Sequence, residues 1–154
     1  VLRQHPHVEA TLFDVPAVAA LARQRLASSP VASRLRIVEG DFFTDPLPED
    51  HDAILLANVL HNFLPQRNRA LLARVHACTP AGARLLLVDF WTDPTHTQPL
   101  TAALMAGAFL LVTGEGDVYS VEDVRDWLQA TGWRLLAHHP LAGPTSMIVA
   151  EKAA

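Results

Sequence analysis

Glycine is absent from the first 39 residues of this chain, and the first of its seven glycines is Gly40. In α/β proteins that bind nucleotides, a glycine-rich loop after the first strand lets the backbone approach the ligand closely. The chain therefore has no glycine-rich cofactor loop ahead of its first predicted strand.

Cysteine and long apolar runs are also scarce. Cys78 is the single cysteine, so the chain has no internal disulfide, which suits a reducing cytoplasm. No apolar stretch reaches the roughly 18 to 20 residues that span a membrane. The longest run, residues 102–113, is interrupted by Gly107, and we expect it to form a buried helix.

The charge and composition narrow the class of protein further. The net charge of −4 leaves no basic patch to neutralise phosphates, which argues against a nucleic-acid partner. Half of the residues are apolar and only 18% are charged, which favours one folded domain over disorder. The chain starts at Val1 without a signal-peptide pattern, and we expect a sequence truncated at its N-terminus.

Strand and helix patterns alternate along the chain, which predicts an α/β fold with a mostly parallel sheet. Two late strands joined by a short Pro/Gly loop favour an antiparallel pair. A capping box at Ser120 and Asp123 predicts the start of a late helix. The predicted strands cover residues 11–13, 35–38, 53–57, 85–88, 133–137 and 147–150, and the predicted helices begin near residues 16, 65, 100 and 121.

Four of these strands end in polar residues. Asp14, Asp41 and Asp89 follow three of them, and Asn58 with His61 follows the strand over residues 53–57, which we expect to be the most buried. Ligands of open α/β sheets bind outside the carboxyl ends of the strands. The four endings therefore predict a single lined site.

Each acidic residue has two interpretations. Asp14 can accept hydrogen bonds from both hydroxyls of a ribose, or it can cap the helix that follows it. Asp41 and Phe42 together suit an adenine ring, but they also suit a loop carboxylate beside a core phenylalanine.

His61 is the candidate general base, because an imidazole can take a proton near neutral pH. The alternative is a purely structural histidine. Asn62 and Asp89 are expected to hold its ring by hydrogen bonds. The sequence has no cysteine pair or His-x-x-x-His pattern, so no metal site is predicted.

The order of these motifs is more specific than any one of them. The segments TLFDVP, VEGDFF, DAILLANVLHNF, PAGARLLLVDF and GEGDVYSVEDVRDWLQATGW resemble the S-adenosylmethionine-dependent small-molecule O-methyltransferases. The likeness is greatest to the bacterial branch of the caffeate and acetylserotonin O-methyltransferase type.

The resemblance implies a role for each candidate residue. Asp14 would hold the ribose of S-adenosylmethionine, Asp41 and Phe42 would contact its adenine, and Asn58 falls close to the cofactor. His61 would be the base, with Asp89 where plant members have a flanking Glu and Asn62 where many relatives have Asp. The second flanking Glu falls near Val118 and is unmatched. Phe63, Met105 and Phe109 would line the acceptor pocket, with core packing as the alternative.

The resemblance also implies an architecture. Residues 1–154 would be the C-terminal part of one catalytic domain with a Rossmann-like class I methyltransferase sheet, mostly parallel with a late antiparallel strand. The first strand, its glycine-rich loop and an N-terminal domain that mediates homodimerisation would precede Val1. The protein would be cytoplasmic and methylate a hydroxyl of a small, aromatic or secondary-metabolite acceptor.

Two alternatives remain open at this point. The same fold and cofactor could serve methylation of carbon or nitrogen, or another tailoring reaction. The chain could also be a non-catalytic remnant, since the glycine-rich loop is missing.

Overall fold

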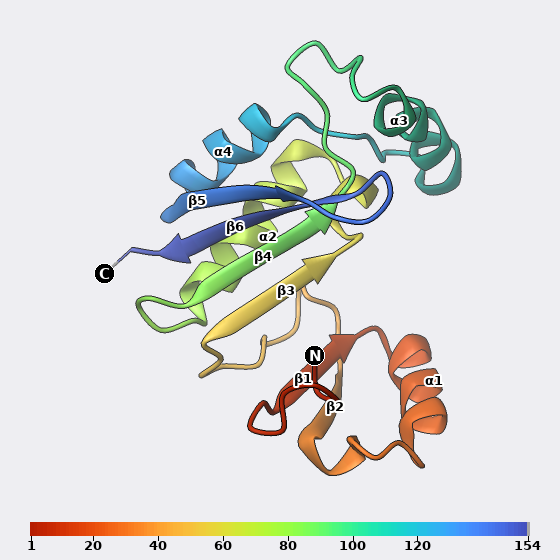
Figure 1. Cartoon of the computed structure of the whole chain (residues 1–154), viewed down its shortest axis with the longest axis vertical. Helices are drawn as coiled ribbons and strands as arrows, with labels where there is room; N and C mark the ends of the chain where they lie inside the picture. The colour runs from red at the N-terminus through yellow and green to blue at the C-terminus, as the bar shows by residue number, and fades with distance from the viewer. Residues whose placement is uncertain (154) are drawn as a thin grey trace. The chain divides into compact units, whose positions relative to one another are not determined.

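The computed structural model describes residues 1–153, which divide into two compact units at Pro48 and Glu49. Figure 1 shows the elements of both units. Each unit is described by itself below.

The first unit is a β-α-β arrangement. It contains strand β1 (Ala10–Asp14), helix α1 (Pro16–Leu26), a 3₁₀ turn η1 (Ala32–Arg34) and strand β2 (Leu35–Glu39). β1 and β2 are parallel, with Ala10 opposite Leu35 and Asp14 opposite Glu39. Their carboxyl ends therefore lie at the same edge of the sheet.

Two residues fix the local structure of this unit. The guanidinium of Arg34 donates hydrogen bonds to the carbonyls of Leu2, His5 and Val8, which ties the N-terminal turns to η1. At the end of β2, a Cβ on Gly40 would lie 2.6 Å from Cζ of Phe13. A larger residue at this position would therefore require the Phe13 ring to move.

The second unit is a four-stranded sheet with helices, in the order β3-β4-β6-β5. β3 is parallel to β4, and β6 is antiparallel to both β4 and β5, so three strands share one direction. The expected α/β fold with a late antiparallel strand is confirmed. The elements are β3 (Ala53–Ala57), η2 (Leu60–Asn62), α2 (Pro65–Ala77), β4 (Arg84–Asp89), α3 (Leu100–Thr113), α4 (Val121–Ala130), β5 (Trp133–Pro140) and β6 (Ser146–Lys152).

The core of the second unit lies among the sheet, α2 and α4. Leucines of α2 and β4 are fully buried there, together with Ile148 of β6. All three tryptophans, Trp91, Trp127 and Trp133, are also buried in this unit. The indole of Trp133 donates a hydrogen bond to the carbonyl of Leu72, which joins β5 to α2.

Two expectations about burial are wrong. β3 has the predicted bounds but is not the most buried strand, since Leu55 is 57% exposed and the alternate residues Ala53 and Ala57 are exposed. The apolar helix α3 buries only Ala102 completely, and Leu111 is 88% exposed. An apolar sequence indicates that a segment packs against other residues, but no described residues bury the exposed side chains of β3 and α3.

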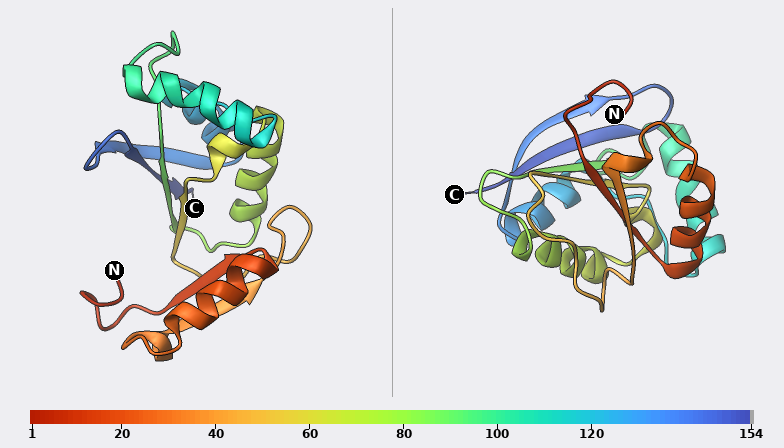
Figure 2. Two further views of the ribbon diagram at one scale, coloured as in Figure 1. Left: turned by 90° about the vertical axis from the view of Figure 1, so that its right-hand side faces the viewer. Right: turned by 90° about the horizontal axis from the view of Figure 1, so that it is seen from below.

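Helix α3 lies over the short turn η2, as the left view of Figure 2 shows. Within residues 1–153, no helix combines the length and the apolar character needed to cross a bilayer.

Candidate active site

The predicted site residues fall into both units. Asp14, Asp41 and Phe42 belong to the first unit, and the rest, from Asn58 to Phe109, belong to the second.

Asp14 is the last residue of β1, as expected. Its Oδ1 accepts a hydrogen bond from the backbone N of Val15 at 2.8 Å. The N-cap of α1 is Val15, and no side chain caps this helix, so the capping interpretation of Asp14 is wrong. The helix instead begins with Pro16, whose fixed φ suits the first helical position. The half-buried carboxylate thus lies at the carboxyl end of a parallel strand.

Asp41 lies two residues beyond β2, at the same edge of the sheet as Asp14. Its Oδ1 accepts from the backbone N of Phe43 at 2.8 Å, and its own N donates to Asp45 at 2.8 Å. The ring of Phe42 is half-buried and meets Phe43 edge to face, with centroids 4.9 Å apart. These contacts fix the loop and leave an exposed acidic residue beside an aromatic ring.

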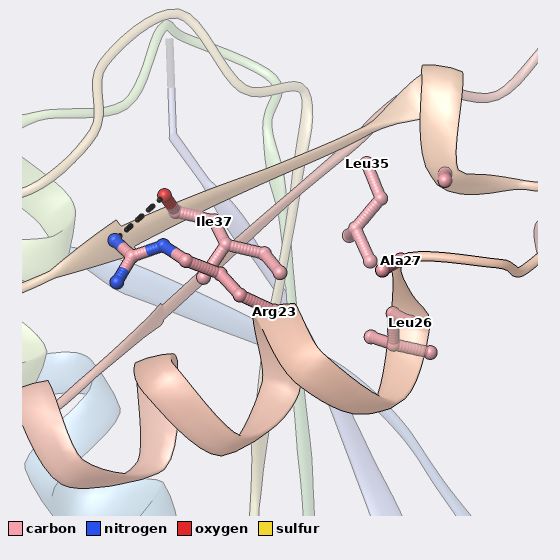
Figure 3. A pocket seen from close by; sticks show the side chains of 6 residues that line it. Arg23, Leu26, Ala27, Leu35 and Ile37 are labelled. Atoms are coloured by element: carbon pink, nitrogen blue, oxygen red, sulfur yellow. Dashed lines mark hydrogen bonds between the residues drawn. The ribbon is translucent and has the colours of Figure 1, made fainter.

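The first unit also has a hollow of about 260 Å³, shown in Figure 3. Arg23 reaches across it and donates to the carbonyl of Ile37. The hollow lies between the last turn of α1 and the start of β2, at the amino ends of the strands. It is therefore not the edge where Asp14 and Asp41 lie. Its lining residues are Arg23, Leu26, Ala27, Ala32, Leu35 and Ile37.

In the second unit, His61 and Asp89 form a buried pair. Asp89 ends β4, and His61 lies in η2, just beyond β3. The His61 Nδ1 is 2.6 Å from Asp89 Oδ1, and the two side chains are 9% and 2% exposed. The same oxygen also accepts from the backbone N of Phe90 at 2.9 Å. The expectation that Asp89 holds the His61 ring agrees with this geometry.

The hydrogen bond sets the tautomer of His61. A carboxylate can only accept, so Nδ1 carries the hydrogen and donates it to Asp89. The lone pair of the neutral ring is then on Nε2, which has no hydrogen-bond partner among residues 1–153. Nε2 is therefore the atom that can take a proton.

Aromatic side chains surround the imidazole. The ring of Phe109, from α3, stacks on His61 with centroids 3.7 Å apart and an angle of 10°. Phe90 meets both rings edge to face, at 6.4 Å from His61 and 5.6 Å from Phe109.

Asn68 and Tyr119, which no sequence motif marks, hold the turn that carries His61. Asn68 in α2 is fully buried, and its Nδ2 donates to the carbonyls of Leu60 and Phe63, on either side of His61. The hydroxyl of Tyr119 donates to the Phe63 carbonyl at 2.6 Å. An Asn inside a helix is an unfavourable choice for the helix itself, and this was the available signal.

The hydroxyl of Tyr119 remains a donor throughout the neutral range. Burial raises the pKa of Tyr119, and the nearby carboxylates of Asp117, Glu115 and Asp123 raise it further. Because the folded-state pKa lies above the unfolded one of about 10, deprotonation of Tyr119 destabilises the fold, and the stability is fully present below that value. The stabilisation is lost only as the pH rises beyond that value.

The remaining predicted residues lie around this turn. Asn62 does not hold the ring: its Nδ2 donates to the carbonyls of Asn58 and Val59, so it fixes the backbone instead. Asn58 is exposed and has a φ of 57°, a left-handed conformation that Asn tolerates. Phe63 and Met105 are half-buried, and the guanidinium of Arg67 lies 4.6 Å from the Phe63 ring.

Among the residues described, no cluster of three or more His, Cys, Asp or Glu side chains could hold a metal ion.

Comparisons with known proteins agree with the fold. Residues 1–134 match the O-methyltransferase domain family. The 3-hydroxy-5-methyl-1-naphthoate 3-O-methyltransferase of Streptomyces sahachiroi is 38% identical over 130 residues, which is 84% of this chain and 37% of that protein.

Solved structures extend the match to nearly the whole chain. An O-methyltransferase family 2 protein from Planctomyces limnophilus, solved with apigenin, is 33% identical with a TM-score of 0.93, over 99% of this chain and 45% of that one. Human N-acetylserotonin methyltransferase, solved with S-adenosylmethionine, is 28% identical with a TM-score of 0.87, over 99% and 43%. The chain thus spans less than half the length of these relatives. Because the domain match and the fold agree over most of its residues, this chain belongs to the O-methyltransferase domain family.

Proposed function

We propose that the protein containing this chain transfers a methyl group from S-adenosylmethionine to a hydroxyl of a small, aromatic or secondary-metabolite acceptor. The observation that carries this proposal is the buried His61–Asp89 pair, in which Asp89 holds Nδ1 and leaves Nε2 of His61 for an acceptor hydroxyl. The family supports oxygen as the methylated atom, since the naphthoate relative is itself an O-methyltransferase.

His61 acts as the general base. Its Nε2 removes the proton of the acceptor hydroxyl, and the ring becomes an imidazolium. The carboxylate of Asp89, 2.6 Å from Nδ1, stabilises that positive charge and fixes the direction of Nε2. A general base of this kind contributes about 10² to 10⁴ in rate.

The first unit offers groups that suit the cofactor. The half-buried carboxylate of Asp14 would accept hydrogen bonds from the ribose hydroxyls, and Asp41 with Phe42 would contact the adenine. In the second unit, Asn58 would lie close to the cofactor. When bound, S-adenosylmethionine supplies an electrophilic methyl group on its sulfonium.

Phe63, Met105 and Phe109 would contact the acceptor. All three are half-buried, so each keeps apolar surface that a flat aromatic ring could cover.

Both units would belong to one catalytic domain, because the family match runs across their boundary at residue 48. We further propose a cytoplasmic homodimer, in which the dimer contacts come from sequence outside this chain. The exposed leucines of α3 support an additional covering segment. Light scattering of the complete protein would test the dimer, and a monomer would contradict it.

The proposed function is tested by His61→Ala in the complete protein, with methyl transfer to hydroxylated aromatic acceptors followed by product mass. We expect turnover to fall about 10² to 10⁴-fold, with little change in the affinity for S-adenosylmethionine. His139→Ala serves as the matched control, because His139 is exposed on β5.

Unchanged turnover of the His61 variant would contradict the assignment of the base. Absence of a methylated product with every acceptor, together with absence of cofactor binding, would contradict the methyltransferase proposal itself.

A further inference from the structure

We propose that Phe109 is a positioning residue for the base, holding the His61 imidazole in the orientation from which Nε2 meets the acceptor. This inference deepens the proposed function and rests on His61 being the base. It gives Phe109 a second role beside the contact with the acceptor proposed above, because one face of its ring stacks on His61.

A single hydrogen bond does not fix an imidazole. With Asp89 holding only Nδ1 at 2.6 Å, the ring could still tilt about the Nδ1–Oδ1 line and swing Nε2 away from the acceptor. The ring of Phe109 lies nearly parallel to the imidazole, with centroids 3.7 Å apart and an interplanar angle of 10°, and it blocks this motion on one face. Phe90, edge-on to both rings, limits lateral movement.

The stack also favours the product of proton transfer. A cation over the face of an aromatic ring is attracted by the negative potential of that face. The imidazolium formed at His61 would lie over the face of Phe109, so an aromatic side chain serves here better than an aliphatic one of similar size.

The backbone of α3 is joined to the turn that carries His61, which keeps the two rings in register. The hydroxyl of Thr113 donates to the carbonyl of Phe109 and accepts from the N of Gly116. The N of Asp117 then donates to the carbonyl of His61 at 3.0 Å. The end of α3 and η2 are therefore connected by three consecutive hydrogen bonds.

The inference is tested with Phe109→Leu and Phe109→Tyr in the complete protein. We expect the leucine variant to lower kcat about tenfold, while the KM for the acceptor stays within about twofold. The tyrosine variant keeps the aromatic face and should restore most of kcat. Gln129→Ala, at an exposed polar position of α4, is the control and should match the parent.

A spectroscopic measurement makes the test independent of activity. In the parent protein, the ring-current field of Phe109 should shift the carbon-bound protons of the His61 ring upfield, with the resonances assigned by their loss in His61→Ala. These protons should return toward ordinary positions in Phe109→Leu. Unshifted resonances in the parent would overturn the inference even if the leucine variant failed to fold.

The kinetic outcomes separate the inference from the proposed function. A loss of turnover in His61→Ala with unchanged kcat in Phe109→Leu would overturn only the positioning role. A rise in KM with unchanged kcat would also overturn the positioning role and leave Phe109 only its contact with the acceptor. Unchanged turnover in His61→Ala would remove the base, and the positioning role with it.

Discussion

Gly116 is the residue at which the site has least room. A Cβ at this position would lie 2.5 Å from the carbonyl oxygen of His61 and 2.6 Å from Oγ1 of Thr113. Because the first of these atoms is backbone, it cannot rotate away as a side chain could. Gly116, three residues beyond the end of α3, therefore restricts where the turn of His61 can lie.

Gly116→Ala should accordingly displace η2 and disturb the base. We expect a loss of about 1 to 3 kcal/mol in the free energy of unfolding, typical of overpacking, together with a fall in kcat. Denaturant unfolding and steady-state kinetics measure the two effects. Gly107→Ala is the control, since a Cβ there meets no atom within 4 Å. Equal stability of the two variants would show that the turn can move freely.

The sequence located the proposed base and its partner carboxylate better than the residues that support them. A histidine just beyond one apolar strand and an aspartate at the end of the next can be predicted from strand ends, because parallel strands end at one edge. The roles of Asn68 and Gly116 depend on contacts between elements far apart in the chain, which periodicity cannot show. Asn62 was assigned to the ring because it adjoins His61, but a neighbour in a 3₁₀ turn points elsewhere.

At the scale of elements, α4 has the strongest local signal. The Ser120 hydroxyl accepts from the N of Asp123 at 3.0 Å, and the Asp123 carboxylate accepts from the N of Ser120 at 3.0 Å. The capping box predicted from the sequence is confirmed. Each bond satisfies a backbone donor that the helix itself leaves unpaired.

Ser120→Ala should destabilise the fold by about 1 kcal/mol, within the usual range for a lost N-cap. Equilibrium urea denaturation measures the change. Asp126→Ala, at an exposed position of the same helix, should change the stability by less than about 0.5 kcal/mol. A similar loss in both variants would show that the effect of Ser120→Ala is not specific to the cap.

Element types were easier to predict than element burial. The apolar sequences of β3 and α3 specify a strand and a helix, and both are present with nearly the predicted bounds. The burial of β3 and α3 depends on which other residues pack against them, and the sequence of the segment itself does not contain that information. The leucines of α3 remain exposed among residues 1–153 for that reason.

At the scale of the whole molecule, three parallel strands have a free edge. Within residues 1–153, β1 and β2 pair only with each other, and β3 pairs with β4 alone. A strand at the edge of a sheet has backbone donors and acceptors without ladder partners. Parallel sheets are ordinarily buried, with helices on both faces. A longer chain could supply the missing partners, since the relatives are more than twice as long.

We therefore expect the 154-residue chain alone to bind S-adenosylmethionine weakly and to be poorly stable, and a chain of the relatives' length to bind it tightly. Titration calorimetry of both forms measures the difference. In the longer form, Asp14→Asn should weaken binding about tenfold, because it removes a charge-assisted acceptor. Tight binding of S-adenosylmethionine by the 154-residue chain would contradict the expectation that the unpaired strand edges weaken it.

The burial of the tryptophans has a practical consequence for studies of unfolding. Trp91, Trp127, Trp133 and the single tyrosine, Tyr119, all lie in the second unit, and residues 1–48 contain neither residue type. Intrinsic fluorescence therefore follows the second unit alone, whereas far-ultraviolet circular dichroism follows both. Coincident transitions by the two probes would show that the units unfold together, and separate transitions would give the first unit a stability of its own.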